Sequence, residues 1–120
     1  REFLVMGDFN IAHTPDDLAN PSANRRYPGF MPDEREWFGR LLGPRTLVDV
    51  VRALHPEVKG PYSWWRWGPQ AWQRGTGWRI DYHLASPGLA MRAIAAGTDR
   101  EPSYEQRMSD HSPVVVDYAW

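Results

Sequence analysis

The sequence contains no cysteine, and it has no apolar run long enough to cross a bilayer. The first absence excludes disulfide bonds, thiolate nucleophiles and cysteine-based zinc sites, so any metal must take oxygen or imidazole ligands. The second excludes a membrane-spanning helix. Neither positive nor negative charge is in excess. Since 14 basic residues face 15 acidic ones, the net charge of -1 does not by itself indicate a nucleic-acid partner.

What the chain does contain is enough for one globular domain: 120 residues, of which 42% are hydrophobic. It begins with the apolar run Phe3–Met6, without an initiator methionine and without the basic, apolar and small-residue regions of a signal peptide. We therefore expect the sequence to be the interior of a longer protein.

The pattern of apolar residues predicts a strand, a loop and a helix in the first third of the chain. The run Phe3–Met6 predicts a short buried strand that ends at a functional loop starting with Gly7 and Asp8. Residues 12–31 are rich in Pro, Asn, Asp and Gly and predict a long functional loop. Residues 32–43 predict a helix, with proline first, acids in the first turn and glycine at the end. We expect its apolar residues to form one buried stripe: Trp37, Phe38, Leu41 and Leu42.

Three further stretches predict strands. In residues 79–85 apolar and polar residues alternate, which places Asp81 and His83 on the same face. Residues 89–97 predict another strand, although their alanine content also suits a helix, and the β-branched run in 113–118 predicts a third. Residues 47–54 are apolar but favour neither type.

Three polar clusters each lie at the end of a strand-like run, namely Gly7-Asp8-Phe9-Asn10, Arg79-Ile80-Asp81 and Ser109-Asp110-His111. A lone Asp there is more often a turn or cap residue, but three clusters together favour a site, because strand ends hold side chains rigidly. Asp oxygens and water would bind a hard divalent cation, Mg²⁺ or Mn²⁺, which suits phosphoryl substrates. His111 would add a base or charge donor, with its ring oriented by Asp81. The set suits phosphodiester hydrolysis.

Residues 58–80 contain no acid, four basic residues and five of the seven tryptophans. Aromatic rings interleaved with arginine are typical of a nucleic-acid surface, because sugars or bases pack on the rings while arginine holds phosphates. A tryptophan-rich core edge with solvated arginines would give the same pattern. This segment alone does not separate the two interpretations.

Five ordered motifs now suggest a family: Gly7-Asp8-Phe9-Asn10, Gly29–Arg35, Tyr62–Trp65, Gly77–Tyr82 and Ser109–Pro113. Together they resemble the motifs of exodeoxyribonuclease III, the Mg²⁺-dependent AP endonuclease family. The first and last alone would indicate the wider endonuclease/exonuclease/phosphatase superfamily, which includes inositol phosphatases and sphingomyelinases. The resemblance implies an α/β fold, the C-terminal half of a four-layer, DNase I-like α/β sandwich, with a mixed, mostly antiparallel sheet and flanking helices.

The resemblance also implies catalytic roles. Asp8 would activate the attacking water or assist the leaving 3′ oxygen, and Asn10 would hold the phosphate and that water. His111 would stabilise the phosphorane or act as base, with Asp81 accepting its ring hydrogen bond. Asp110, together with Asp8, would lie at the Mg²⁺ site.

A second group of residues would bind the substrate. Trp64, Trp78 and Ile80 match positions that wall a pocket for a flipped-out abasic sugar. The loop 66–75, which includes Arg66, would intrude into DNA. Arg25 and Arg26 would contact the DNA backbone.

The implied activity is Mg²⁺-dependent cleavage of double-stranded DNA at abasic sites and blocked 3′ ends in base excision repair. The parent protein would be monomeric, cytoplasmic and, in a bacterium, nucleoid-associated. In the family the first half of the fold supplies an Asn, the principal metal-binding Glu and a Tyr, and none has a counterpart here. The missing N-terminal half would act in cis as a partner of this chain. Two alternatives stay open. In the first, the isolated chain is a non-catalytic DNA-binding or complementation fragment that lacks the metal-binding Glu. In the second, the protein is another phosphodiesterase of the superfamily, against which Trp64 and Trp78 argue.

Overall fold

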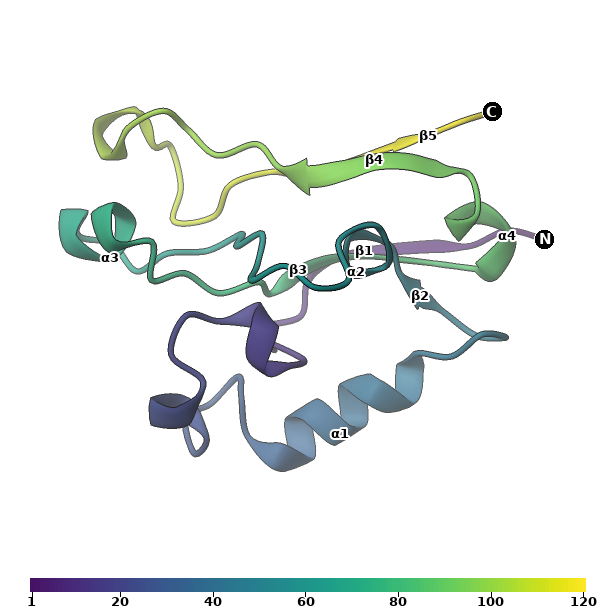
Figure 1. The fold of residues 1–120 in the computed structure, drawn as a ribbon, viewed down its shortest axis with the longest axis horizontal. Coiled ribbons are helices and arrows are strands. Elements are labelled where there is room, and N and C mark those ends of the chain that lie inside the picture. Colours follow the sequence, from purple (N-terminus) through teal and green to yellow (C-terminus); the bar gives the residue numbers. More distant parts are fainter.

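Strand β3 (Asp81–Ala85) is the central strand of the larger sheet in the computed structural model, which describes residues 1–120. It pairs antiparallel with β1 (Leu4–Asp8) on one side and with β2 (Val48–Asp49) on the other. A second antiparallel pair joins β4 (Ala93–Thr98) to β5 (Val114–Tyr118). Figure 1 shows the β4–β5 pair above the central sheet and the longest helix below it. The expected α/β fold with mostly antiparallel pairing is confirmed.

Seven short helical segments connect these strands: α1 (Pro32–Leu41), α2 (Val50–Leu54), α3 (Pro69–Arg74), α4 (Pro87–Ala90), and the 3₁₀ turns η1 (Pro15–Asp17), η2 (Ser22–Asn24) and η3 (Tyr104–Gln106). Four of them begin with proline. Proline suits this position because its missing N–H would have no helical partner there and its φ already has the helical value. No helix of the structure is long and apolar enough to span a membrane.

Helix α1 begins where the sequence predicts. Met31 offers no side-chain cap, and the Glu34 carboxylate takes over that function by accepting the N–H groups of Gly29 and Met31 at 2.8 and 3.0 Å. Phe38 is fully buried, but the prediction for Trp37 is wrong, because its side chain is 45% exposed. Neighbouring helix residues point about 100° apart, so a stripe centred on Phe38 leaves Trp37 at its solvent edge.

The main core lies between α1 and the face of β3 that carries Tyr82 and Leu84. Ile11, Phe38, Tyr82 and Leu84 form its buried centre. The Tyr82 hydroxyl lies 2.7 Å from the Ile11 carbonyl oxygen, so the one polar atom of this centre is paired. Burial raises the pKa of this phenol well above its ordinary value. The alternation predicted for residues 79–85 is confirmed within β3, where Asp81 and His83 lie on the face opposite Tyr82 and Leu84. It is wrong for the two residues before the strand, because Ile80 lines a pocket that includes His111 and the Arg79 guanidinium lies over the Tyr82 ring.

Strand β1 differs from its prediction. All five of its residues are exposed, although an apolar run of this kind predicted a buried strand. β1 is an edge strand of its sheet, and no other element of the chain covers its outer face. Phe3 and Met6 are among the large apolar side chains left exposed.

Two other stretches each contain both a helix and a strand. Residues 89–97 do not form one strand, since α4 occupies the beginning and β4 starts at Ala93. Residues 47–54 contain both types, with β2 followed directly by α2. Asp49 causes the switch, because its carboxylate caps α2 by accepting the N–H of Arg52.

Three polar side chains that the sequence did not assign to a site hold elements of the fold together. The ring of His55 lies 2.7 Å from the Ala96 carbonyl and ties α2 to β4. His83 contacts the Val114 carbonyl and thereby links β3 to β5. Lys59 donates to the carbonyls of Pro15 and Leu18, which fixes the predicted loop 12–31.

Candidate active site

The three polar clusters of the sequence meet at one end of the central sheet. The antiparallel register of β1 and β3 places Asp8 directly opposite Asp81. A third segment arrives from the β5 side, where His111 forms an isolated bridge with Trp64. The side chains of Asp8, Asp81 and His111 bring potential ligand atoms within 4.8 Å of one another.

His111 lies between three carboxylates. Its Nδ1 is 2.8 Å from an oxygen of Asp81, a hydrogen-bonding distance. Its Nε2 lies 3.8 Å from Asp8 and 4.0 Å from Asp110. When Nδ1 carries a proton and donates it to Asp81, the ring orientation is fixed and Nε2 faces the other two carboxylates.

Asp110 is held ionised by its neighbours. The Trp64 indole N–H donates to its carboxylate at 3.0 Å. Partial burial acts to raise the pKa of Asp110, but this hydrogen bond, a backbone hydrogen bond and the nearby His111 together lower it below its usual range. The carboxylate is therefore available at neutral pH as a charged ligand or acceptor.

Asn10 adopts a backbone conformation that is uncommon for residues other than glycine. Its φ is 54°, in the left-handed region. Its backbone N–H donates to the carboxylate of Asp8 at 2.7 Å, so the turn fixes the Asp8 side chain against the backbone of Asn10. Strain of this kind is concentrated at functional sites, where the surrounding structure holds it in place.

A pocket of about 240 Å³ opens beside these groups. It is lined by Asn10, Pro28, Trp64, Trp78, Ile80, Asp110 and His111. The rings of Trp64 and Trp78 meet edge to face with their centres 6.4 Å apart. Together with Ile80 they supply apolar walls of the pocket, and Asn10, Asp110 and His111 supply its polar groups. The pocket residues predicted from the sequence are thus brought together, and Pro28 is an addition that the motifs did not reveal.

Two small residues shape this pocket. Gly29 has a φ of 102°, and a Cβ there would lie 3.1 Å from the Trp78 ring, so a larger residue would displace the wall. The Ser63 hydroxyl accepts the N–H groups of Ile80 and Asp81 at 3.1 and 3.2 Å. Ser63 therefore fixes the backbone just before β3, which carries the orienting carboxylate.

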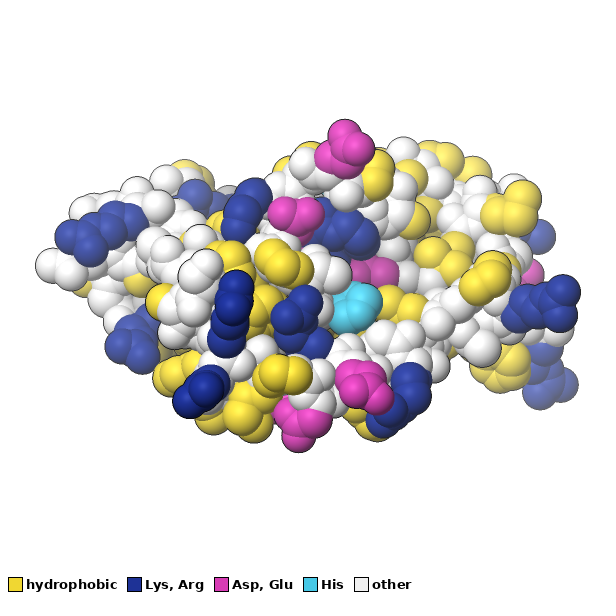
Figure 2. Space-filling view, turned by 60° about the horizontal axis from the view of Figure 1, so that its bottom comes forward, with side chains coloured by type: hydrophobic (Ala, Val, Ile, Leu, Met, Phe, Trp, Pro, Cys, Tyr) yellow, Lys and Arg dark blue, Asp and Glu magenta, His cyan; other side chains and the backbone are white.

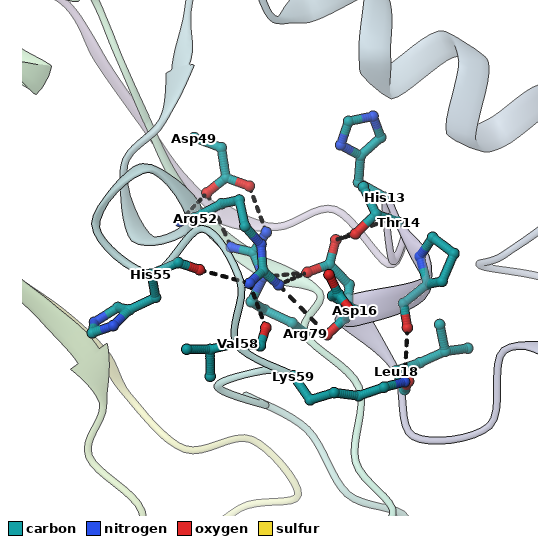
Figure 3. Close-up of polar contacts among 12 residues, drawn as sticks. His13, Thr14, Asp16, Leu18, Asp49, Arg52, His55, Val58, Lys59 and Arg79 are labelled. Carbon is teal, nitrogen blue, oxygen red and sulfur yellow. Dashed lines mark hydrogen bonds and ion pairs between the residues drawn. The ribbon is translucent and has the colours of Figure 1, made fainter.

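Beneath the site lies a buried ion-pair network centred on Arg79, shown in Figure 3. The guanidinium donates from Nε to Asp17 at 2.7 Å and from Nη1 to Asp49 at 3.0 Å, and Arg52 contacts the same Asp17 carboxylate. Burial alone would raise the pKa of Asp17, but Arg79 and Arg52 hold it below its usual range. Because Arg79 lies between pocket residues Trp78 and Ile80, the network anchors the pocket wall to loop 12–31 and β2.

The tryptophan-rich segment 58–80 combines both interpretations of its sequence. Trp65 and Trp72 are buried, 3% and 5% exposed, and pack edge to face at 4.8 Å. Trp64 and Trp78 line the pocket, and Trp67 is exposed. The segment is therefore partly core and partly site surface, and periodicity could not assign the individual rings.

The predicted DNA-contacting arginines lie outside the pocket. Arg66 is exposed and borders a separate hollow with α3, while Arg25 and Arg26 are exposed near η2. Arg25 lines another hollow that also includes Arg35. Figure 2, which brings the bottom of Figure 1 forward, shows Lys and Arg side chains gathered around hydrophobic ones.

The donor set at the site fits a hard divalent cation. Asp8 and Asp110 each present a carboxylate oxygen toward Nε2 of His111, and oxygen ligands are those that Mg²⁺ or Mn²⁺ takes. The group of potential ligand atoms within 4.8 Å of one another, however, consists of Asp8, Asp81 and His111 and does not include Asp110. Asp81 is already engaged with the ring of His111. Two carboxylates are fewer ligands than an octahedral ion needs, so water, substrate or further protein groups would complete the set.

Comparison with known proteins agrees with this arrangement. The chain is 41% identical over 116 residues to an exodeoxyribonuclease of Bacillus subtilis, covering 97% of this chain and 44% of that protein. It is 35% identical to recombination repair protein 1 of Drosophila melanogaster, covering 97% of this chain and 16% of the relative. The chain thus spans less than half of these relatives, and it corresponds to their C-terminal part.

Solved structures show the same fold. An AP endonuclease from Archaeoglobus fulgidus superposes with a TM-score of 0.88 at 32% identity, covering 98% of this chain and 45% of that chain. A Neisseria 3′ phosphatase bound to a product DNA hairpin gives a TM-score of 0.89 at 34% identity, covering 99% and 46%. Residues 1–111 match the model of the Endonuclease/Exonuclease/phosphatase family. The chain, with its converging Asp8, Asp81, Asp110 and His111, therefore belongs to the endonuclease/exonuclease/phosphatase family.

Proposed function

We propose that the protein carrying this chain is a divalent-metal-dependent AP endonuclease, with 3′–5′ exonuclease and 3′-phosphodiesterase activity, that acts on double-stranded DNA in base excision repair. The observation that carries the proposal is the position of His111. Its Nε2 faces the carboxylates of Asp8 and Asp110, and His111 lines a pocket walled by Trp64 and Trp78. The names of the relatives, which include exodeoxyribonuclease and AP endonuclease, support the same activity.

The side chains of the site can divide the work of phosphodiester hydrolysis. Asp81 holds the ring of His111 through Nδ1, so that Nε2 is aimed at the reacting phosphate, where a protonated ring would stabilise the developing charge. Asp8 is placed to take a proton from the attacking water or to assist the leaving 3′ oxygen. The Asn10 backbone is fixed by its N–H donating to the Asp8 carboxylate. Its side-chain amide would orient the phosphate and that water.

Asp8 and Asp110 would hold the divalent cation, Mg²⁺ or Mn²⁺. When bound, it supplies positive charge that neutralises phosphate oxygens. The lowered pKa of Asp110 supports this assignment, because an ionised carboxylate is required.

The pocket supports an abasic nucleotide as the preferred substrate. Trp64, Trp78 and Ile80 present apolar surfaces to a volume of about 240 Å³, which polar side chains also line. A sugar without its base can pack against such walls while its phosphate meets His111 and Asn10. Arg25, Arg26 and Arg66 are exposed and would contact DNA phosphates outside the pocket.

The remaining part of the domain would cover the exposed face of β1 and complete the site. β1 exposes apolar side chains on the strand that delivers Asp8, and the chain spans 44% of its Bacillus subtilis relative. We assign to that missing half the metal-binding Glu for which this chain has no counterpart. The complete protein would be a cytoplasmic monomer.

A nicking assay tests the proposal. A duplex oligonucleotide with one synthetic abasic site is incubated with the complete protein and, in parallel, with the 120-residue chain, in Mg²⁺ or in EDTA. We expect Mg²⁺-dependent incision 5′ to the lesion by the complete protein, and loss of most of it in His111→Ala with DNA binding retained. Incision that survives His111→Ala would overturn the mechanism.

The same assay distinguishes the alternatives. DNA binding by the 120-residue chain without incision would mean that it acts as a complementation fragment, and adding the other half would restore cleavage. Hydrolysis of inositol phosphates with no incision of DNA by the complete protein would replace the proposed function by a different phosphodiesterase activity.

A further inference from the structure

A second buried arginine, Arg107, lies four residues before His111 and has an unusual environment. Arg107 is only 8% exposed, yet no carboxylate lies within ion-pair distance of its guanidinium. One of its nitrogens, Nη1, is buried without a hydrogen-bond partner. Burying a charge without a counter-charge costs stability, so the guanidinium needs an explanation other than ion pairing.

Its hydrogen bonds go to two backbone carbonyls around the site. Nε donates to the carbonyl of Ser109 at 3.2 Å, and Nη2 donates to the carbonyl of Trp65 at 3.0 Å. Trp65 in turn donates its backbone N–H to the carbonyl of Asp110 at 3.0 Å. Arg107 therefore fastens the loop that carries Asp110 and His111 to the segment that carries Trp64.

Aromatic rings enclose the guanidinium and restrict its position. Its central carbon lies 4.7 Å from the ring centres of both Trp67 and Trp72, and 5.7 Å from that of Tyr104. The Tyr104 hydroxyl accepts the N–H of Gly68 at 3.1 Å, which ties η3 to the start of α3. Stacking of this kind suits a planar guanidinium and partly offsets the missing counter-charge.

An apolar side chain could fill this space between the rings, but it could not hold two carbonyls at fixed positions. We propose that Arg107 is a positioning residue for Asp110 and His111, which acts by joining the Ser109 and Trp65 carbonyls. The inference rests on the proposed function and deepens it, because it assigns the geometry of that site to a residue outside the pocket.

Arg100 offers a matched control in the same aromatic cluster. It stacks 4.0 Å from the ring centre of Trp72 and 5.0 Å from that of Trp65, and its Nη2 donates to the Trp72 carbonyl. None of its contacts reaches residues 108–111. Loss of its guanidinium therefore disturbs the cluster without releasing the loop that carries His111.

The experiment compares Arg107→Met, Arg107→Lys, Arg100→Met and the unmodified sequence in the complete protein. Steady-state cleavage of abasic DNA gives kcat and KM, thermal melting reports folding, and hydrogen exchange by mass spectrometry reports the amides of residues 109–111. We expect Arg107→Met to lower kcat about 10- to 100-fold with KM within about twofold, as a displacement near 1 Å would do. Arg107→Lys, which keeps a donor but not the fork, should recover part of that loss.

The expected exchange result is faster exchange of residues 109–111 in Arg107→Met and an unchanged rate in Arg100→Met. A kcat within twofold of the unmodified protein in Arg107→Met, or an equal loss in Arg100→Met, would overturn the positioning role. If Arg107→Met does not fold, an unchanged kcat in Arg107→Lys overturns it instead. An inactive unmodified protein would refute the proposed function, and hydrogen exchange would still decide whether Arg107 holds the loop.

Discussion

Arg79 and Arg107 are both buried, but the regions around them are built in opposite ways. Arg79, 1% exposed, lies between two carboxylates, and its charge is matched within the core. Arg107 has carbonyl oxygens and aromatic rings around it and no counter-charge. The two buried arginines therefore have different roles. The region around Arg79 stabilises the fold through ion pairs, while the region around Arg107 fixes the geometry of one loop.

The largest expected effect is that of breaking the first region. Arg79→Met should lower the free energy of unfolding by about 3–5 kcal/mol, because it leaves Asp17 and Asp49 as buried carboxylates without their main partner. Urea denaturation of the complete protein at neutral pH measures the change. A loss below about 1 kcal/mol would contradict the assignment of Arg79 as the anchor of the fold.

Acid should weaken the same region. The pKa of Asp17 is lowered from 3.8 in the folded state, so the unfolded chain binds more protons in the window below that value. The stability that ionised Asp17 contributes is therefore fully present above about pH 3.8. It is lost as the pH falls through the lower pKa that Asp17 has in the folded state. We expect Asp17→Asn to cost about 1–3 kcal/mol at pH 7 and the difference from the unmodified protein to narrow in acid. Urea titrations at several pH values test this, and a constant difference would contradict it.

Substitution in the second region, around Arg107, should lower the free energy of unfolding by less. The decrease should not depend on the ionisation of a carboxylate. Arg107→Met removes two hydrogen bonds but also an unpaired buried charge, so we expect a loss of about 1–2 kcal/mol in the free energy of unfolding. The loss should be the same at pH 7 and in acid, because no carboxylate faces Arg107. A loss as large as that of Arg79→Met would remove the contrast between the two regions.

The smallest effect is expected at an exposed arginine. Arg40 pairs with Glu36 at 2.8 Å across one turn of α1, and both side chains are largely exposed. Arg40→Met should change the free energy of unfolding by less than about 0.5 kcal/mol, because solvent and salt screen such pairs. The same urea measurement checks it and provides the baseline for both buried arginines.

The sequence predicted the parts of the site that depend on order along the chain. Asp8, Asp81 and His111 were expected to converge from the positions of their clusters at strand ends, and the β1–β3 register and the Trp64–His111 bridge bring them together. Residues 81–85 alternate as a half-buried strand must, so their two faces could be assigned. The alternation within β3 is local and follows from a local pattern. The convergence is not local, but each cluster could be placed because it follows a strand-like run and strand ends hold side chains rigidly.

Packing between distant segments was not predictable where no polar cluster or strand end marked the residues. Asp17 and Asp49 are 32 residues apart in the numbering of the sequence and look like ordinary turn or cap residues, yet both bind Arg79. Trp64 and Trp65 are neighbours with the same side chain, and the fold places one in the pocket and the other in the core. The exposure of β1 depends on what covers the strand, which its own apolar run does not encode.

The left-handed backbone of Asn10 also limits which sequences could ever occupy this position. Glycine would accept the conformation but would bring no amide, and glutamine would bring the amide at a backbone cost of about 1–2 kcal/mol. Aspartate tolerates the conformation but would place a negative charge where a phosphate is expected. A library randomised at position 10 and selected for cleavage should therefore return asparagine almost alone, which makes this residue a fixed point for anyone who engineers the enzyme.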